Sequence, residues 1–293
     1  MQVCTLCPRR CGVNRAEKAG ACGERAVLRV ARAALHPWEE PCISGTTGSG
    51  TLFFSGCPLG CVYCQNGAIS RGGAGRAVTP AQLGEAMLRL QDDGAHNINL
   101  VTPMHVTPLV LQGLEGVRHR LHIPIIVNTG GYESVETIAR WAGLCDIWLP
   151  DFKYKSTELS VRYSAAPDYF DRAAAAILAM HRQQPTVELD SDGLIRRGLM
   201  VRHLVLPGGR QDSAEIVRWL AENLPRDGFL LSLMGQFTPN EGCASFPELQ
   251  RTVTTFEYQS VLTVAQALGL QGYGQSRTAA AQGYVPAFDL NLR

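Results

Sequence analysis

Apolar and polar positions along the chain form blocks that repeat in the order strand, then helix. From residue 51 onward, short apolar runs predict strands at Thr51–Phe54, Asn97–Val101, Ile123–Asn128, Asp146–Leu149, Leu199–Leu206 and Phe229–Met234. Between and after them, helical spacing of apolar residues predicts helices over 80–90, 107–119, Val135–Ala142, Thr157–Ser164, Phe170–Gln183, Ser213–Asn223 and Phe256–Leu268. Six such units predict an α/β fold with a parallel barrel, complete or partial, and a functional site at the carboxyl ends of its strands.

Residues 1–50 do not show this alternation of predicted strands and helices. They hold five of the ten cysteines, several arginines and a turn-rich run from Ser44 to Gly50. We therefore expect two parts, a Cys-rich N-terminal extension over 1–50 and a barrel with a C-terminal helix and tail over 51–293. The tail after Gly272 has no pattern that predicts an element.

Composition narrows the class of protein. The chain has 293 residues, of which 45% are hydrophobic and 18% charged, so disordered, collagen-like and coiled-coil proteins are excluded. The formal net charge is +1, which gives no overall basic field to attract nucleic acid or an anionic membrane. The first residues lack a secretory signal pattern, and no run of 18 apolar residues occurs. We expect a cytoplasmic protein that binds neither nucleic acid nor membrane.

Eight of the ten cysteines lie at or before Cys64, and three of them form a compact triplet. Cys57, Cys61 and Cys64 are spaced by three and two residues, directly after the first predicted strand. In a cytosolic protein such clusters more often bind metal than form disulfides. A loop of this length is able to place three thiolates on one [4Fe–4S] cluster, which leaves one iron open. A zinc site completed by an N-terminal cysteine is the alternative.

The triplet and its surroundings resemble the radical S-adenosylmethionine (SAM) superfamily, in which C-x3-C-x2-C follows the first strand of a partial (βα)6 barrel of the TIM type. More narrowly, the chain is similar to the PflX-type homologues of pyruvate formate-lyase activating enzyme. The segments that carry this similarity are 4–15, 20–23, Glu39-Glu40-Pro41, Ser44-Gly45-Thr46, 53–56 and Cys64-Gln65-Asn66.

The resemblance implies specific cofactors and roles. A [4Fe–4S] cluster on Cys57, Cys61 and Cys64 would bind SAM and cleave it reductively to a 5′-deoxyadenosyl radical, which abstracts a hydrogen atom. Tyr63 would lie beside the SAM adenine, with Asn66 nearby. The implied partners are an electron donor such as a flavodoxin or ferredoxin and a polypeptide substrate, a glycyl radical enzyme.

Polar residues at the ends of later strands are further candidates for binding SAM. Thr102 and His105 stand where activating enzymes have a glycine-rich motif, although a histidine there is equally often structural. Asn128 begins a run whose glycines allow close approach to a ligand. Asp151 and Lys153 resemble the family's Asp-x-Lys motif, and residues two apart on extended chain face one way. Arg202 needs an anionic partner if buried, either SAM or a carboxylate of the barrel.

Four further thiols occur within nineteen residues of the extension, at Cys4, Cys7, Cys11 and Cys22. Four thiolates saturate either a structural zinc or a second iron–sulfur cluster, and the sequence does not choose between them. Free thiols packed on the barrel are the third interpretation.

The leading functional hypothesis is a radical SAM oxidoreductase of the activating-enzyme type. Its alternative within the same class is modification of a small molecule or another peptide, because one fold hosts many reactions. The alternative of another class is a non-catalytic iron–sulfur or zinc protein, against which the strand-end residues Asp151, Lys153 and Arg202 argue.

Overall fold

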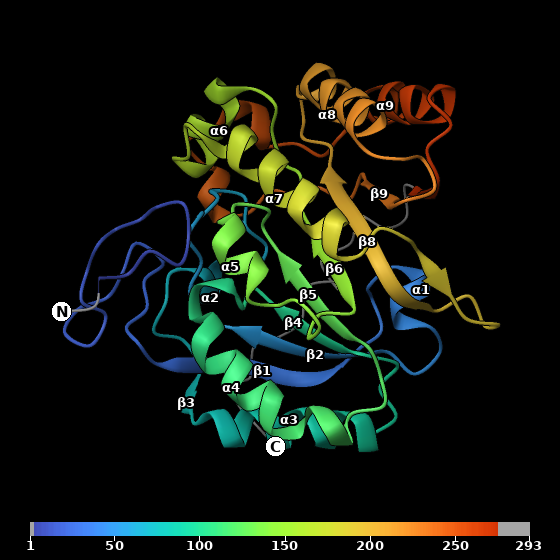
Figure 1. Cartoon of the computed structure of the whole chain (residues 1–293). Helices are drawn as coiled ribbons and strands as arrows, with labels where there is room; N and C mark the ends of the chain where they lie inside the picture. Colours follow the sequence, from blue (N-terminus) through green and yellow to red (C-terminus); the bar gives the residue numbers. More distant parts are fainter. Residues whose placement is uncertain (1–2, 275–293) are drawn as a thin grey trace.

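The core of the molecule is one open, mostly parallel sheet (Figure 1). The computed structural model describes residues 3–274, and its strands lie in the order β10-β9-β8-β6-β5-β4-β2-β1-β3. The six strands from β9 to β2 run parallel, at β2 Ser49–Phe54, β4 Ile98–Val101, β5 Ile125–Thr129, β6 Ile147–Pro150, β8 Ile195–Leu204 and β9 Leu230–Met234. These are the six strands predicted from the apolar runs. Because the strand order does not close, the prediction of a partial barrel is confirmed.

The sheet also includes short or irregular strands that the sequence pattern did not reveal. β1 (Leu28–His36) lies antiparallel to β2, and β3 (Arg76–Val78) lies antiparallel to β1. At the other edge, β10 (Gly272–Gly274) runs parallel to β9, and β7 (Glu188–Leu189) pairs with β8. Three of these strands are too short for a periodic pattern, and β1 is rich in alanine, which has low strand propensity. The sheet therefore begins within residues 1–50.

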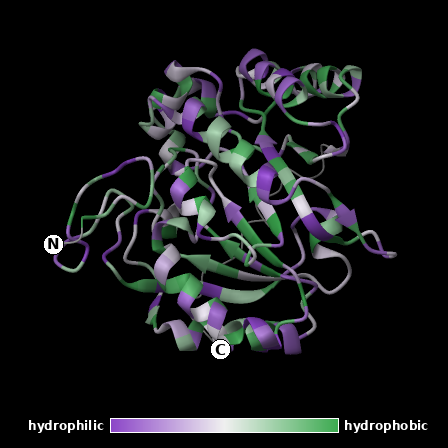
Figure 2. Ribbon diagram, in the orientation of Figure 1, coloured by the Kyte–Doolittle hydropathy of each residue, from purple (hydrophilic) through white to green (hydrophobic). Residues whose placement is uncertain are grey.

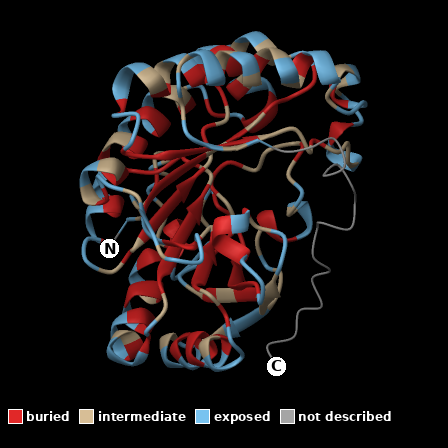
Figure 3. Cartoon of the chain, turned by 90° about the vertical axis from the view of Figure 1, so that its right-hand side faces the viewer, coloured by how far each residue is buried: buried red, intermediate tan, exposed pale blue. Residues whose placement is uncertain are grey.

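Helices cover the sheet and leave its six central parallel strands mostly buried (Figure 3). The long helices are α3 Pro80–Asp92, α4 Thr107–Val117, α6 Thr157–Ser164, α7 Tyr169–Gln183, α8 Arg210–Asn223 and α9 Thr255–Ala267. The short ones are α1 Pro41–Ser44, α2 Gly67–Ser70, α5 Val135–Ala139 and the 3-10 turns η1 Met104–Val106, η2 Arg118–Arg120, η3 Glu241–Cys243 and η4 Pro247–Leu249. Hydrophobic residues concentrate in the strands and on the inner helix faces (Figure 2). Thr79 caps α3 as expected, because its hydroxyl accepts the N–H of Gln82.

Glu257 attaches α9 to the loop that follows β8. Its carboxylate completes a capping box with Thr254, pairs with Arg251 and accepts the N–H of Gly208 at 2.7 Å. The hydrogen bonds from Arg251 outweigh burial and hold the pKa of Glu257 below its ordinary value of 4.5. A carboxyl with a depressed folded-state pKa stabilises the protein above its unfolded-state pKa, and this stabilisation is lost as the pH falls through the folded-state pKa.

We expect Glu257→Gln to lower the free energy of unfolding by about 1–3 kcal/mol at pH 7, because it removes hydrogen bonds to a charged group. The loss should shrink as the pH falls below 4.5, which urea unfolding at several pH values measures. Glu222→Gln, at an exposed position of α8, is the control and should change stability by under about 0.5 kcal/mol. A loss that does not vary with pH would contradict this role of the Glu257 charge.

Among residues 3–274, no helix is both long and apolar enough to cross a membrane.

Candidate functional site

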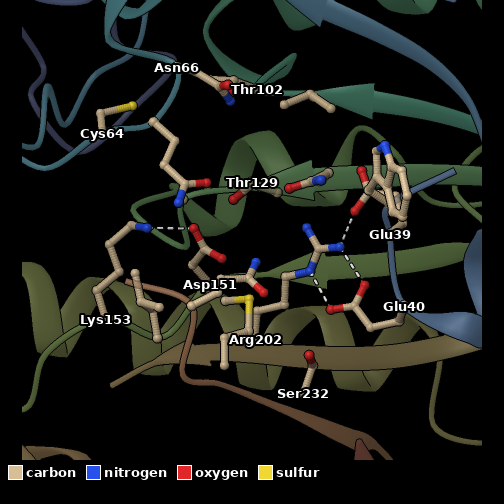
Figure 4. A pocket seen from close by; sticks show the side chains of 18 of the residues that line it. Glu39, Glu40, Cys64, Asn66, Thr102, Thr129, Asp151, Lys153, Arg202 and Ser232 are labelled. Carbon is tan, nitrogen blue, oxygen red and sulfur yellow. Dashed lines mark hydrogen bonds and ion pairs between the residues drawn. The ribbon is translucent and has the colours of Figure 1, made fainter. Parts of the chain in front are cut away.

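A cavity of about 490 Å³ opens at the carboxyl ends of the parallel strands (Figure 4). This volume lies within the range of small-molecule sites, about 300–1,000 Å³. Every parallel strand from β2 to β9 contributes to it. The residues at or just after the strand ends that line it are Phe53, Val101, Thr102, Asn128, Thr129, Gly130, Asp151, Arg202, Leu204, Ser232 and Met234.

Most of the predicted site residues meet in this cavity, although they come from distant parts of the chain. Those that line it are Cys57, Cys61, Tyr63, Cys64, Asn66, Thr102, Asn128, Asp151, Lys153 and Arg202. His105 and the four N-terminal cysteines do not line it. The structure thus assembles the candidates at the edge of the sheet where the βα pattern predicts a site.

The loop after β2 presents the three cysteines of the triplet. Gly56, with φ +86°, begins the loop, and a Cβ there would lie 2.7 Å from the carbonyl oxygen of Cys22. Backbone N–H groups of Leu59 and Gly60 contact the sulfur of Cys57, and that of Asn66 contacts Cys64. The hydroxyl of Ser164 donates to the sulfur of Cys61 at 2.9 Å.

These three thiols fit an iron–sulfur cluster by their chemistry. Burial first, and the proximity of Cys61 and Cys64 next, raise the pKa of Cys57 to about 12. Burial and Cys61 also raise the pKa of Cys64. The thiolates of Cys57 and Cys64 are therefore disfavoured without a cation. Metal binding would deprotonate such thiols, and soft thiolates suit iron–sulfur clusters. Cys57, Cys61 and Cys64 would hold the cluster, and hydrogen bonds to the sulfurs would tune it.

Tyr63 connects the cysteine loop to a buried aromatic cluster. Its ring packs edge-on against Tyr154, Tyr163 and Phe237 at centroid distances of 6.0–6.4 Å. Its hydroxyl lies 2.6 Å from that of Tyr154. Because the ring also lines the cavity, Tyr63 forms a rigid, apolar wall at the position where the resemblance implies contact with adenine.

Asp151 and Lys153 follow β6 and face the cavity together, as their spacing predicts (Figure 4). The ammonium group of Lys153 donates to the carboxylate of Asp151. Burial disfavours the charge of Lys153, but Asp151 outweighs it and holds the pKa of Lys153 well above its usual range. The ammonium charge of Lys153 is therefore present at neutral pH and lies beside the carboxylate of Asp151 in the cavity.

The backbone at Thr102 is held in an uncommon conformation. Its φ is +60°, which is rare for a residue other than glycine, and its N–H donates to the carbonyl oxygen of Asn128 at 2.8 Å. Such strain tends to occur where surrounding structure serves a functional site. No feature of the sequence predicts this conformation.

Arg202 projects from β8 into the other side of the cavity and pairs with two adjacent carboxylates (Figure 4). Its Nε donates to Glu40 at 2.8 Å, and its Nη2 contacts both Glu39 and Glu40. Glu39 also accepts from Asn99 at 3.0 Å. The expected anionic partner of Arg202 is thus provided by the segment after β1. In the sequence, the two glutamates before Pro41 form part of the family resemblance, and nothing in their spacing indicates a pairing with Arg202.

His105 differs from its predicted place. Its side chain is 1% exposed, lies outside the cavity lining and has Nε2 2.8 Å from the carbonyl oxygen of Ser55. Burial lowers its pKa to about 4, so the ring is neutral at pH 7. Of the two roles expected for His105, this position favours the structural one, because the 3-10 turn η1 places its ring against the backbone of the cysteine loop and outside the cavity lining.

Comparisons with known proteins agree with this architecture. The family model described as a 4Fe-4S single cluster domain matches residues 43–156. An uncharacterized protein of Methanocaldococcus jannaschii is 27% identical over 276 residues, which cover 91% of this chain and 75% of that protein.

Solved structures share the fold at low sequence identity. A radical SAM methyltransferase from Sphaerobacter thermophilus superposes with a TM-score of 0.53 and 17% identity, over 80% of this chain and 70% of that chain. Methylornithine synthase superposes with a TM-score of 0.51 and 18% identity, over 76% of this chain and 63% of its own. The segment with Cys57, Cys61 and Cys64 therefore matches a 4Fe-4S single cluster domain, and the chain shares its fold with a radical SAM methyltransferase and with methylornithine synthase.

Proposed function

We propose that this protein is an enzyme that cleaves SAM reductively, with a [4Fe–4S] cluster on Cys57, Cys61 and Cys64. The observation that carries the proposal is that these thiols line the same cavity as Asp151 and Lys153. Three protein thiolates leave one iron of a four-iron cluster open to a ligand. When bound and reduced, the cluster supplies one electron to the SAM sulfonium, which yields methionine and a 5′-deoxyadenosyl radical that abstracts hydrogen.

The residues of this chain bind and orient the cofactor. Asp151 and Lys153 present one negative and one positive charge to the cavity, which suits the amino and carboxylate groups of SAM. Tyr63 and its aromatic neighbours form a wall that excludes water from the reacting atoms. Arg202 is held by Glu39 and Glu40 on the opposite side of the cavity.

The test is anaerobic reconstitution with iron and sulfide, followed by reduction with dithionite in the presence of SAM. The expected products are methionine and 5′-deoxyadenosine, measured by liquid chromatography. EPR of the reduced protein should change when SAM is added. If the EPR spectrum does not change when SAM is added and no 5′-deoxyadenosine forms, the protein is instead a non-catalytic electron carrier.

Asp151 provides a specific prediction for SAM binding. Replacement by Asn removes its charge and leaves Lys153 without its ion-pair partner. We expect the Kd for SAM to rise about 10–100-fold, which corresponds to about 1.5–3 kcal/mol for hydrogen bonds to charged groups. Equilibrium dialysis of the reconstituted protein measures this, with Asp190→Asn as the control because Asp190 pairs with Arg196 at the surface. An unchanged Kd in Asp151→Asn would remove Asp151 from the SAM site.

The finer proposal is that the hydrogen donor is a backbone glycine of a partner enzyme and that a flavodoxin or ferredoxin supplies the electron. It is supported by the sequence resemblance and by Trp38, which lines the cavity while 55% exposed and so offers an aromatic contact to a polypeptide. Incubation with SAM and a glycyl radical enzyme should produce an organic radical on that partner, detected by EPR. Efficient 5′-deoxyadenosine formation with no radical on the partner would favour a small molecule or another peptide.

A further inference from the structure

The N-terminal segment 3–27 is ordered without the usual means of stabilisation. It contains no helix or strand, since the first element of the described residues is β1. Its buried residues are Cys7, Arg15, Cys22 and Glu24, so the segment lacks an apolar core of its own. Structureless segments of this length are uncommon in compact domains, and small units without a core generally need a metal or cross-links. All ten cysteines of the chain are free in this structure.

The chain brings Cys4, Cys7, Cys11 and Cys22 together within this segment. The N–H of Cys4 donates to Val13 and that of Gly12 to Cys4, which folds the first three cysteines into one tight loop. The side chains of Cys4 and Cys11 are in hydrogen-bond contact. A Cβ on Gly20 would lie 3.3 Å from the sulfur of Cys11 and 3.6 Å from that of Cys22. Glycine therefore leaves the space between these two sulfurs open.

The backbone around these sulfurs repeats the arrangement of the cavity cysteines. The sulfurs of Cys7, Cys11 and Cys22 each contact the backbone N–H of the residue two positions later. These residues are Arg9, Val13 and Glu24, respectively. Cys57 and Cys64 have the same contact, from Leu59 and Asn66. Hydrogen bonds of this kind orient metal-bound thiolates and adjust their charge. Arg10 and Gly12, at φ +39° and +64°, make the turns that aim these N–H groups.

An unpaired polar atom lies at the base of the same cluster. Glu133 is 3% exposed, and its Oε2 has no hydrogen-bond partner in the structure. It is close enough to Cys7 to act electrostatically on that thiol. On the other side, Arg15 is buried and acts on Cys22 with the opposite sign. A buried, unsatisfied polar atom near Cys7, one of the four thiols, is the kind of exception that a bound ion explains.

We propose that Cys4, Cys7, Cys11 and Cys22 form a second metal centre, a four-thiolate site for a thiophilic metal, and that this centre holds segment 3–27 on the barrel. The metal is zinc or an iron–sulfur cluster, which share this ligand chemistry. Within residues 3–274 no three metal-binding groups are already arranged to hold an ion, either here or at Cys57, Cys61 and Cys64, so loading requires the sulfurs to move.

The centre adjoins the cavity loop. The N–H of Cys57 donates to the carbonyl oxygen of Cys22 at 3.0 Å, and Arg9 donates to Pro58 at 2.8 Å. Further along, Ser134 and Thr137 donate to the carbonyl oxygen of Leu6 at 3.0 and 2.6 Å. Segment 3–27 is therefore attached to the barrel by polar contacts to the cavity loop and to the start of α5. These contacts depend on the shape of the cysteine loops, which the metal would set.

The test uses the full chain with Cys57, Cys61 and Cys64 all replaced by Ala, so that any remaining centre is the N-terminal one. This background is loaded anaerobically with Zn²⁺, or with ferrous iron and sulfide, and then desalted. We expect about one zinc, or about four irons with four sulfides, per chain. Zinc binding alone assigns a structural site, and iron with sulfide assigns a cluster. Less than about a tenth of either loading would overturn the proposal. Because the background lacks the cavity ligands, failure here is separate from failure of the proposed function.

Two pairs of substitutions in that background locate the ligands. Cys4→Ser with Cys11→Ser, at half-exposed positions, and Cys7→Ser with Cys22→Ser, at buried positions, should each lower bound metal at least about tenfold. Cys42→Ser, in the buried helix α1, is the matched control and should keep the metal. Trypsin cleavage at the exposed Lys18 and Arg25 should be slow with metal and fast after chelation. Metal retained in the Cys4/Cys11 variant, or cleavage that chelation leaves unchanged, would contradict the site.

Discussion

Replacing any one of Cys57, Cys61 and Cys64 by Ala is expected to abolish SAM cleavage. With two thiolates the cluster loses one of the three ligands that position it, and the cavity offers no fourth cysteine among the residues that line it. Formation of 5′-deoxyadenosine after dithionite reduction should fall to the level of protein without a cluster. This is the largest effect that we expect from a single substitution, because the whole reaction depends on the electron that the cluster delivers.

Cys145→Ala is the matched control for this experiment. Cys145 is buried just before β6, and its thiol donates only to the carbonyl oxygen of Ile147 at 3.2 Å. Its removal should cost about 1 kcal/mol of stability and leave SAM cleavage intact. Iron counting separates the causes, since each triplet variant should bind fewer irons than Cys145→Ala. Undiminished cleavage in Cys61→Ala would contradict the ligand assignment.

Replacing Arg202 by Met is expected to lower the free energy of unfolding by about 3–5 kcal/mol, the range for breaking a buried ion pair by removing one partner. The side chain of Arg202 is 12% exposed, and those of Glu39 and Glu40 are 8% and 6% exposed. Burial opposes the charges, but each partner offsets that cost, so that the pKa of Arg202 is raised well above its usual range and the pKa of Glu40 is lowered. Without the guanidinium, two adjacent carboxylates would stay buried with no cation.

Urea unfolding at pH 7 measures this loss, and a combined variant tests its cause. Arg202→Met together with Glu39→Gln and Glu40→Gln removes all three charges, so at least half of the lost stability should return. Arg196→Gln on the same strand is the control, because Arg196 pairs with Asp190 at the surface and should contribute under about 1 kcal/mol. A loss below 1 kcal/mol in Arg202→Met would mean that water reaches the glutamates.

The six parallel strands and the cysteine triplet were predictable because the information that specifies them is local in the sequence. Each of the six parallel strands contains an apolar run, because a strand covered on both faces is mostly buried. The triplet and the Asp151–Lys153 pair are also local, because the members of each lie within eight residues of one another. Their spacing alone therefore predicts which side chains can share a ligand. Roles at the cofactor remain predictions for Tyr63, Asn66, Thr102, Asn128 and Arg202, although all of them line the cavity.

The sequence by itself determined the order of the six parallel strands and of the long helices, the edge of the sheet where the candidate residues meet, and the thiol triplet, because periodicity and short spacing act within one segment. Tertiary structure alone decided the partners of Arg202, which are 162 and 163 residues away, the burial of His105 under the cysteine loop, and the meeting of Cys22 with Cys57. It also decided that β1 joins the sheet within the Cys-rich region. These features depend on which surfaces pack together. The sequence does not show this, because a charged side chain or an imidazole has the same local sequence pattern whether packing buries it or leaves it in water.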